Sequence, residues 1–133
     1  GPGDPMVSTG VMNNTLELDG RFLRQSYKGD QSEGPFPNFE GHGFWGFNTI
    51  TNMYEGFWID NASTFMQTES GQVDPSGKVW IMKGQVPDPN SGAAMTKRSV
   101  ITLKDDNHHS MEMFFTAPDG SEFKAMEIQY KRA

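Results

Sequence analysis

Apolar and polar positions alternate along this chain in short runs, and no stretch of helical length shows an apolar period of 3.6 residues. Runs rich in β-branched and aromatic residues recur between clusters of Gly, Pro, Asn and Asp. Such a pattern is typical of strands joined by turns, so it predicts an all-β protein of about nine strands. The expected strands cover residues 7–18, 21–28, 39–47, 54–60, 64–73, 78–85, 96–103, 109–116 and 123–131.

The segments between these strands carry residues that favour tight turns, such as DG at 19–20, DPSG at 74–77 and PDG at 118–120. Evenly spaced strands joined in this way form a meander, which can fold as a sandwich or as an up-and-down barrel. We favour the barrel, because closure removes exposed strand edges. A chain of 133 residues suits one domain better than two, so we expect residues 1–133 to form a single barrel domain.

The triplet GFW occurs twice, at residues 43–45 and 56–58, and predicts the register of one hairpin. If Phe47 pairs with Tyr54, each bulky side chain of one strand faces a glycine of the other. The resulting pairs are Trp45 with Gly56, Trp58 with Gly43, and Asp60 with Gly41. Glycines in strands mark places of close approach, so the pattern favours a curved antiparallel hairpin.

Composition and charge argue against several classes of partner. The chain has 11 Lys plus Arg and 17 Asp plus Glu, a net charge of −6, and no basic cluster, which argues against nucleic acid and anionic membranes. No apolar run approaches the roughly 20 residues that span a bilayer. The first residues lack the features of a signal peptide, so we expect a soluble protein and favour a cytoplasmic location. The absence of Cys excludes disulfides and thiolate sites.

Five ordered blocks of sequence carry a family resemblance. They are GRFLRQSYKGD at 20–30, GFWGFN at 43–48, YEGFWIDNASTFMQTESG at 54–71, PDPNSG at 87–92 and FKAMEIQYKR at 123–132. Together they resemble the domain-of-unknown-function family 1579 over nearly the whole chain. The resemblance implies a calycin-like antiparallel barrel, related in shape to lipocalins, and it supplies no catalytic residue.

Two departures from the family pattern bear on function. Gly46, Phe47 and Asn48 stand where the family usually has Gly-Tyr-Asp, so a hydroxyl and a charge are lost. The family's N-terminal helix and first strand, which precede the segment matched by Pro2 and Gly3, are also missing from this sequence. Such an absence would leave the barrel with an unclosed edge, and a homodimer could cover that edge.

The face that carries Trp45, Phe47, Tyr54, Trp58 and Asp60 is the first candidate ligand site, because an apolar wall that ends in one acid resembles a small-molecule pocket. The same aromatic residues could instead form a packed core, and Asp60 could serve an Asx turn. Nine Met residues, Met66 among the candidates, are scattered over most strands. They could line a pocket for varied hydrophobic ligands or fill a small barrel.

A carboxylate pair is the second candidate. A two-residue turn at Asp119 and Gly120 would place Glu112 opposite Glu127, and like charges in such a pair could raise one pKa, bind a cation or recruit a base such as Arg98. A solvated outer face is the alternative, and a three-residue loop would remove the pairing.

No metal site or cofactor is predicted. His108 and His109 point to opposite faces of a strand, and His42 could serve as a haem ligand, as in the distantly similar nitrobindin barrels, but has no supporting motif. We therefore predict a barrel that binds a small, mostly apolar ligand. The alternatives are an enzyme that uses Asp60 or Glu112 and Glu127 as acid/base groups, with Arg98 binding an anionic group, and a structural homodimer.

Overall fold

The computed structural model describes residues 6–30, 37–117 and 119–131, and these residues form nine strands and no helix. The strands are β1 (Met6–Glu17), β2 (Phe22–Gly29), β3 (Glu40–Asn48), β4 (Met53–Asp60), β5 (Gln67–Val73), β6 (Val79–Pro87), β7 (Ala94–Asp105), β8 (His108–Thr116) and β9 (Glu122–Lys131). All nine predicted strands are therefore confirmed. The largest shift of a strand boundary lies at β5, which begins at residue 67 instead of 64. The turn that follows β4 is anchored on Asp60.

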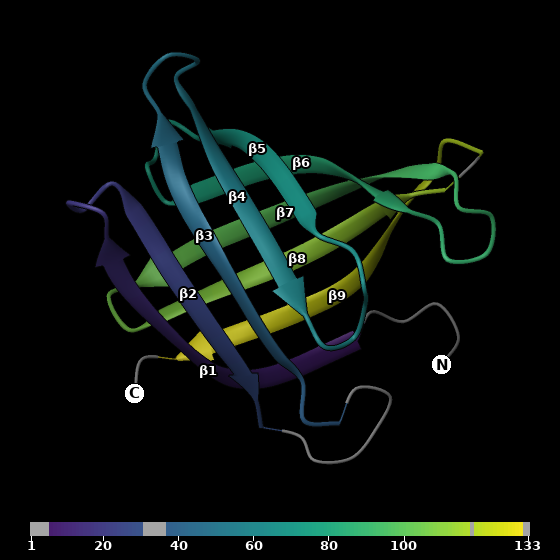
Figure 1. The fold of residues 1–133 in the computed structure, drawn as a ribbon, viewed down its shortest axis with the longest axis horizontal. Coiled ribbons are helices and arrows are strands. Elements are labelled where there is room, and N and C mark those ends of the chain that lie inside the picture. The colour runs from purple at the N-terminus through teal and green to yellow at the C-terminus, as the bar shows by residue number, and fades with distance from the viewer. Residues whose placement is uncertain (1–5, 31–36, 118, 132–133) are drawn as a thin grey trace.

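The nine strands close into a barrel in sequence order (Figure 1). Every consecutive pair is antiparallel, whereas β1 and β9 pair in parallel, from Met6 opposite Met126 to Gly10 opposite Tyr130. An odd number of alternating strands brings the first and last strands together in the same direction, so only a parallel pair can close the ring. The predicted barrel is confirmed, but an antiparallel arrangement throughout is not.

The expectation of an unclosed edge is wrong. Strand β1 fills the position between β2 and β9, and it forms ladders with both neighbours. The homodimer that was expected to cover the open edge therefore loses its premise. The expected connector at residues 30–37 and the segment matched by Pro2 and Gly3 lie almost wholly outside the described residues.

The β3–β4 hairpin has the register that the doubled GFW predicts. Phe47 pairs with Tyr54, Trp45 with Gly56 and Trp58 with Gly43. A Cβ added at Gly43 would lie only 2.2 Å from the carbonyl oxygen of Phe57, so this position has no room for a side chain. The loop is held by the Asn48 side chain, whose Oδ1 accepts hydrogen bonds from the amides of Ile50 and Thr51.

The β8–β9 hairpin contains a loop that differs from the expected two-residue turn. Three residues separate Ala117 from Ser121, whose backbone groups are hydrogen-bonded to each other, and Pro118 lies outside the described residues. Ala125 is an extra residue on β9, since Met113 pairs with Met126 while Phe114 pairs with Lys124. This β-bulge shifts the register by one residue and restores the predicted pairing of Glu112 with Glu127.

Two groups of apolar residues occupy the inward face of the barrel. Tyr27, Ile128 and Tyr130 form the buried cluster, with Trp58 and Met111 among the residues packed against it. A second group lies near the β3–β4 and β5–β6 connections, where Tyr54 contacts Trp45, Phe47 and Trp80 with ring centroids 4.9–6.3 Å apart. The inward face is therefore aromatic near both ends of the barrel.

Candidate functional site

A polar cluster lies on the inward face between the aromatic groups. Lys97 of β7 donates a hydrogen bond from Nζ to Oε1 of Gln67 at 2.9 Å, and the same Nζ lies 3.5 Å from Oε2 of Glu69. Ser99 completes the cluster, because its Oγ donates to Oε2 of Glu69 at 3.0 Å. Lys97 is only 4% exposed and Ser99 is fully buried, so an ion pair sits inside the barrel.

The register of three neighbouring strands brings this cluster together. Lys97 pairs with Gly84 of β6, and continuing the β5–β6 ladder from the pair Ser70 and Lys83 places Glu69 on the other side of Gly84. Glycine has no side chain, so nothing stands between the ammonium of Lys97 and the carboxylate of Glu69. Because the side chains of Lys97 and Glu69 are only 5% and 13% exposed, their charges are compensated mainly by each other.

The structure brings Trp45, Tyr54, Trp58 and Asp60 to the inward face as the sequence indicates. Asp60 has protein partners for both carboxylate oxygens: Oδ2 accepts a hydrogen bond from Trp58 Nε1 at 2.9 Å, and Oδ1 accepts from the amide of Ala62 at 3.0 Å. The Oγ of Ser63 also donates to Oδ1. The predicted Asx turn at Asp60 is thus confirmed, and the same carboxylate fixes the orientation of the Trp58 indole.

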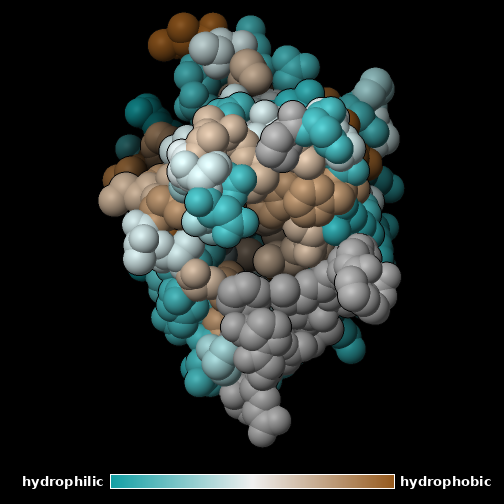
Figure 2. Space-filling model, turned by 90° about the vertical axis from the view of Figure 1, so that its right-hand side faces the viewer, coloured by the Kyte–Doolittle hydropathy of each residue, from teal (hydrophilic) through white to brown (hydrophobic). Residues whose placement is uncertain are grey.

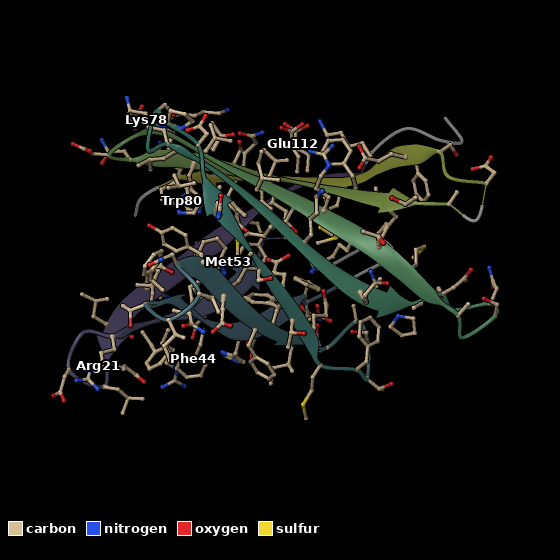
Figure 3. The ribbon with its side chains drawn as sticks, turned by 90° about the horizontal axis from the view of Figure 1, so that it is seen from above. Arg21, Phe44, Met53, Lys78, Trp80 and Glu112 are labelled. Carbon is tan, nitrogen blue, oxygen red and sulfur yellow. The ribbon has the colours of Figure 1, made fainter. Side chains whose placement is uncertain are left out.

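Arg98, Glu112 and Glu127 lie on the outer face, away from the inward cluster. Figure 3 shows Glu112 on the outside of one wall and Phe44 on the outside of the opposite wall, with Trp80 between the two. The Lys124 ammonium bridges both acids, 2.8 Å from Glu112 Oε2 and 2.7 Å from Glu127 Oε2, and its hydrogen bond lowers the pKa of Glu127. The carboxylate pair is therefore part of an outer ion network.

Arg98 belongs to the same outer face and has its own partners. Its Nε and Nη2 donate to the two carboxylate oxygens of Glu122 at 2.9 and 2.6 Å, and its guanidinium lies 4.3 Å from the centre of the Phe114 ring. Hydrogen bonding to Glu122 raises the pKa of Arg98. The charge of Arg98 is therefore paired with Glu122, and its guanidinium plane is stacked on Phe114.

The remaining candidates are also separated from the cluster. Met66 precedes β5 and is 74% exposed. His42 points outward from β3, with Nδ1 3.2 Å from Ser26 Oγ and Nε2 3.4 Å from Glu40 Oε2. This Ser–His–Glu chain resembles a catalytic triad, but Ser26 and His42 lie within a paired antiparallel ladder, which leaves no cluster of free backbone amides to stabilise an oxyanion.

His109 contacts the buried aromatic cluster of Tyr27, Ile128 and Tyr130. Its ring stacks on Tyr130 with centroids 4.2 Å apart and planes within 9°. Burial lowers the pKa of His109 and raises that of Tyr130, so both side chains favour their neutral forms. Among the described residues, no three His, Asp or Glu side chains are grouped so that they could hold a metal ion.

Sequence reasoning missed Gln67, Glu69, Lys97 and Ser99. Lys97 and Arg98 are adjacent, and alternation says only that they face opposite sides of β7. The signal that could have found the cluster is Gly84, which faces Lys97 and Glu69 much as Gly56 and Gly43 face the tryptophans. Using this signal requires the registers of β5–β6 and β6–β7. The sequences of these hairpins do not determine the pairing as clearly as the doubled GFW does for β3–β4.

Comparison with known families identifies the family of this chain. Residues 1–132 match the model of a family described as "Protein of unknown function (DUF1579)", and the chain belongs to this family. No curated protein matches the chain. No helix long and apolar enough to cross a membrane occurs within the part of the chain that the structure describes.

Proposed function

We propose that this member of the DUF1579 family binds a small, mostly apolar molecule inside its barrel. The observation that carries the proposal is an inward face that combines aromatic and Met side chains with one compact polar cluster. Binding sites for small molecules are mostly apolar and contain a few polar groups that orient the ligand. The cluster of Gln67, Glu69, Lys97 and Ser99 has this character, whereas Asp60 is engaged by Trp58 and its own turn.

Incomplete burial of the inward-facing side chains supports the proposal. Buried hydrophobic side chains among the described residues are limited to Tyr27, Met82, Val86, Ile128 and Tyr130. The inward-facing residues Trp45, Tyr54 and Trp58 are only partly buried. The accessible surface is 8685 Å², compared with roughly 7,000 Å² for a compact monomer of this mass. Part of the excess belongs to the inward face, since these aromatic side chains keep accessible surface.

The accessible end of the barrel also favours an apolar ligand. Figure 2 shows a hollow on the side of the molecule that carries the β6–β7 connection, with apolar side chains along its upper edge. Gln67 is the first residue of β5, and Lys97 lies near the start of β7, so the polar cluster is close to this end. A ligand that enters here would reach Lys97 before the aromatic group around Tyr54.

Inward-facing methionines add to the apolar lining. The pairing registers place Met12, Met82, Met111, Met113 and Met126 on the same face as Ser99 and Trp58. Thioether side chains adapt their shape to a ligand at low cost. An enzyme built on the carboxylate pair has less support, because Glu112 and Glu127 lie on the outside and are bridged by Lys124.

Intrinsic fluorescence offers a direct test, because all three tryptophans, Trp45, Trp58 and Trp80, face inward. Titration with Nile red, a neutral apolar dye, is expected to quench the tryptophans and shift the dye emission to the blue with a saturable 1:1 stoichiometry. Native mass spectrometry should detect the 1:1 complex. Non-saturable quenching without a 1:1 complex would contradict the proposal.

A matched pair of variants locates the dye. Trp58→Ala removes part of the inward wall and should weaken Nile red binding at least tenfold, which is about 1.4 kcal/mol. Phe44→Ala removes an aromatic ring from the outer face of the adjacent strand, where Phe44 is 38% exposed, and should leave the affinity within twofold. Equal losses in both variants would argue for binding outside the barrel.

A further inference from the structure

We infer that the barrel selects ligands whose polar group is an uncharged hydrogen-bond acceptor, such as the carbonyl of a ketone, ester or amide, and that Lys97 and Gln67 hold this group. The inference rests on the proposed function, because it requires that a ligand enter the barrel. It identifies the chemical class of that ligand from the donors, acceptors and charges of the polar cluster.

The cluster has hydrogen-bond donors that its own residues do not use. The ammonium of Lys97 carries three N–H donors and meets two acceptor atoms, Oε1 of Gln67 and Oε2 of Glu69. The amide nitrogen of Gln67 carries two more donors. Among the described residues, no further hydrogen bond is formed by Lys97 Nζ or by this amide nitrogen.

The two acceptor atoms that face Lys97, in contrast, are engaged by protein donors. Oε2 of Glu69 accepts a hydrogen bond from Ser99 and lies against the ammonium of Lys97, while Oε1 of Gln67 accepts from Lys97. A ligand that offers an acceptor therefore completes the hydrogen bonding of Lys97 and Gln67. A ligand that offers only donors leaves the donors of Lys97 and Gln67 unused, and could bond to Oε1 of Glu69, which has no hydrogen-bond partner among the described residues.

The charge balance excludes a carboxylate as the preferred polar group. The positive charge of Lys97 is compensated by Glu69 at 3.5 Å, and Asp60 adds a further negative charge on the same inward face, beyond Trp58. A ligand carboxylate would place an uncompensated negative charge beside Glu69 in a site with little access to water. A ligand ammonium would be repelled by the positive charge of Lys97. Asp60 would be a poor partner for it, because the oxygens of Asp60 already accept three hydrogen bonds.

Apolar side chains border the cluster on the same face. Phe115 pairs with Lys97, and Trp58 pairs with Gln67. Gly56 lies directly opposite Glu69, and the Trp45 indole covers that glycine. If the acceptor group of a ligand binds Lys97, the hydrocarbon part of the same ligand would lie against these rings. This arrangement matches the mostly apolar ligand of the proposed function.

A matched series of ten-carbon probes tests the inference by competition with Nile red at pH 7.5. The probes are 2-decanone, with a neutral acceptor, decanoate, with a negative charge, and decylammonium, with a positive charge. The expected result is that 2-decanone displaces the dye at a concentration at least tenfold lower than either charged probe. The inference is overturned if Nile red binds inside the barrel but decanoate or decylammonium competes as well as 2-decanone.

The substitution Glu69→Gln sharpens the test, because it leaves the charge of Lys97 without its partner while keeping the shape and an acceptor for Ser99. We expect decanoate to compete at least tenfold better in this variant than in the parent protein. Glu112→Gln, the same change on the outer face, should leave the ranking of the probes unaltered. An unchanged decanoate affinity in a folded Glu69→Gln variant would overturn the assignment to Lys97.

Failure of the proposed function gives a different result. If Nile red shows no saturable binding and native mass spectrometry detects no complex with any of the three probes, the barrel does not bind such ligands and the inference falls with it. If binding occurs and only the ranking differs, interior binding stands while the assignment of a neutral acceptor is rejected. The parent ranking decides between these results even if Glu69→Gln fails to fold.

Discussion

The stability of the protein depends on keeping both partners of the buried ion pair between Lys97 and Glu69. Removing one partner of a buried pair leaves an uncompensated charge, which typically costs roughly 3–5 kcal/mol. Lys97→Met is therefore expected to lower the free energy of unfolding by about this amount, as measured by urea denaturation. The double variant Lys97→Met with Glu69→Gln should recover at least half of the loss, and equal stabilities of the single and double variants would contradict the pairing.

His109 predicts a pH dependence. Burial against Tyr130 lowers the folded-state pKa of His109 below its ordinary value of 6.5, so the unfolded chain takes up a proton before the folded protein does. The free energy of unfolding should then fall as pH drops below about 6.5, with a slope of at most about 1.4 kcal/mol per pH unit for one proton. His109→Phe keeps the aromatic contact and should flatten this slope in thermal unfolding measured between pH 7.5 and 5.5.

NMR titration of the imidazole provides an independent measurement for the same residue. The expected titration midpoint of His109 lies below 6.5. A midpoint at or above that value would contradict the sign of the argument, because a raised pKa would make the folded protein more stable in acid.

At the scale of elements, the outer surface of the β8–β9 hairpin depends on Lys124. Its hydrogen bond to Glu127 lowers the pKa of that carboxyl, and the same ammonium separates Glu127 from Glu112. Lys124→Met should therefore raise the pKa of Glu127, as measured by carboxyl NMR titration. A carboxylate with a lowered pKa contributes stability above its unfolded pKa and loses it as pH falls, so this variant should also lose less stability on acidification.

A matched substitution distinguishes the effect of the Lys124 contact on the pKa of Glu127 from the effect of losing one positive charge. Lys28→Met removes the same charge from an exposed position on β2 and should leave the pKa of Glu127 unchanged. A comparable shift in both variants would mean that net charge, and not the Lys124 contact, controls the titration.

The two hairpins show what sequence can predict at this scale. The β3–β4 register follows from size complementarity, because Trp45 and Trp58 each require a glycine opposite. The predicted pairing of Glu112 with Glu127 is also found, but the expected turn is wrong, and the bulge at Ala125 compensates for the longer loop. Alanine fits a bulge and a regular strand equally well, so no residue type at this position signals the extra residue.

At the scale of the whole molecule, strand number and order were predictable because turn residues punctuate the chain. Closure was not, since it depends on a parallel contact between β1 and β9, which are more than 100 positions apart in sequence and share no turn. The interior cluster was missed for the same reason: Lys97 reaches Gln67 and Glu69 across β6. Long-range pairing, and not local residue type, decides which charged side chains of this barrel face inward.

Closure leads to a prediction about association. Because β1 pairs with β2 through residues 10–17 and with β9 through residues 6–10, every strand among the described residues has a neighbour on both sides, which disfavours pairing with a second copy of the chain. Sedimentation of the parent protein at high concentration should therefore show one species with the monomer mass of 14.9 kDa. Gln129→Pro should change this result, because Gln129 lies between Ser110 of β8 and Thr9 of β1 and proline disrupts the ladder.

The proline variant is expected to open the seam beside β1 and to form dimers or larger species in a concentration-dependent manner. Lys28→Met, which changes an exposed side chain on β2 without removing a backbone donor, should remain monomeric. A stable dimer of the parent protein at micromolar concentration would show that association uses a surface other than a strand edge. The exposed apolar side chains Phe22, Phe44 and Ile59 of neighbouring strands β2, β3 and β4 would then be the first surface to substitute with polar residues.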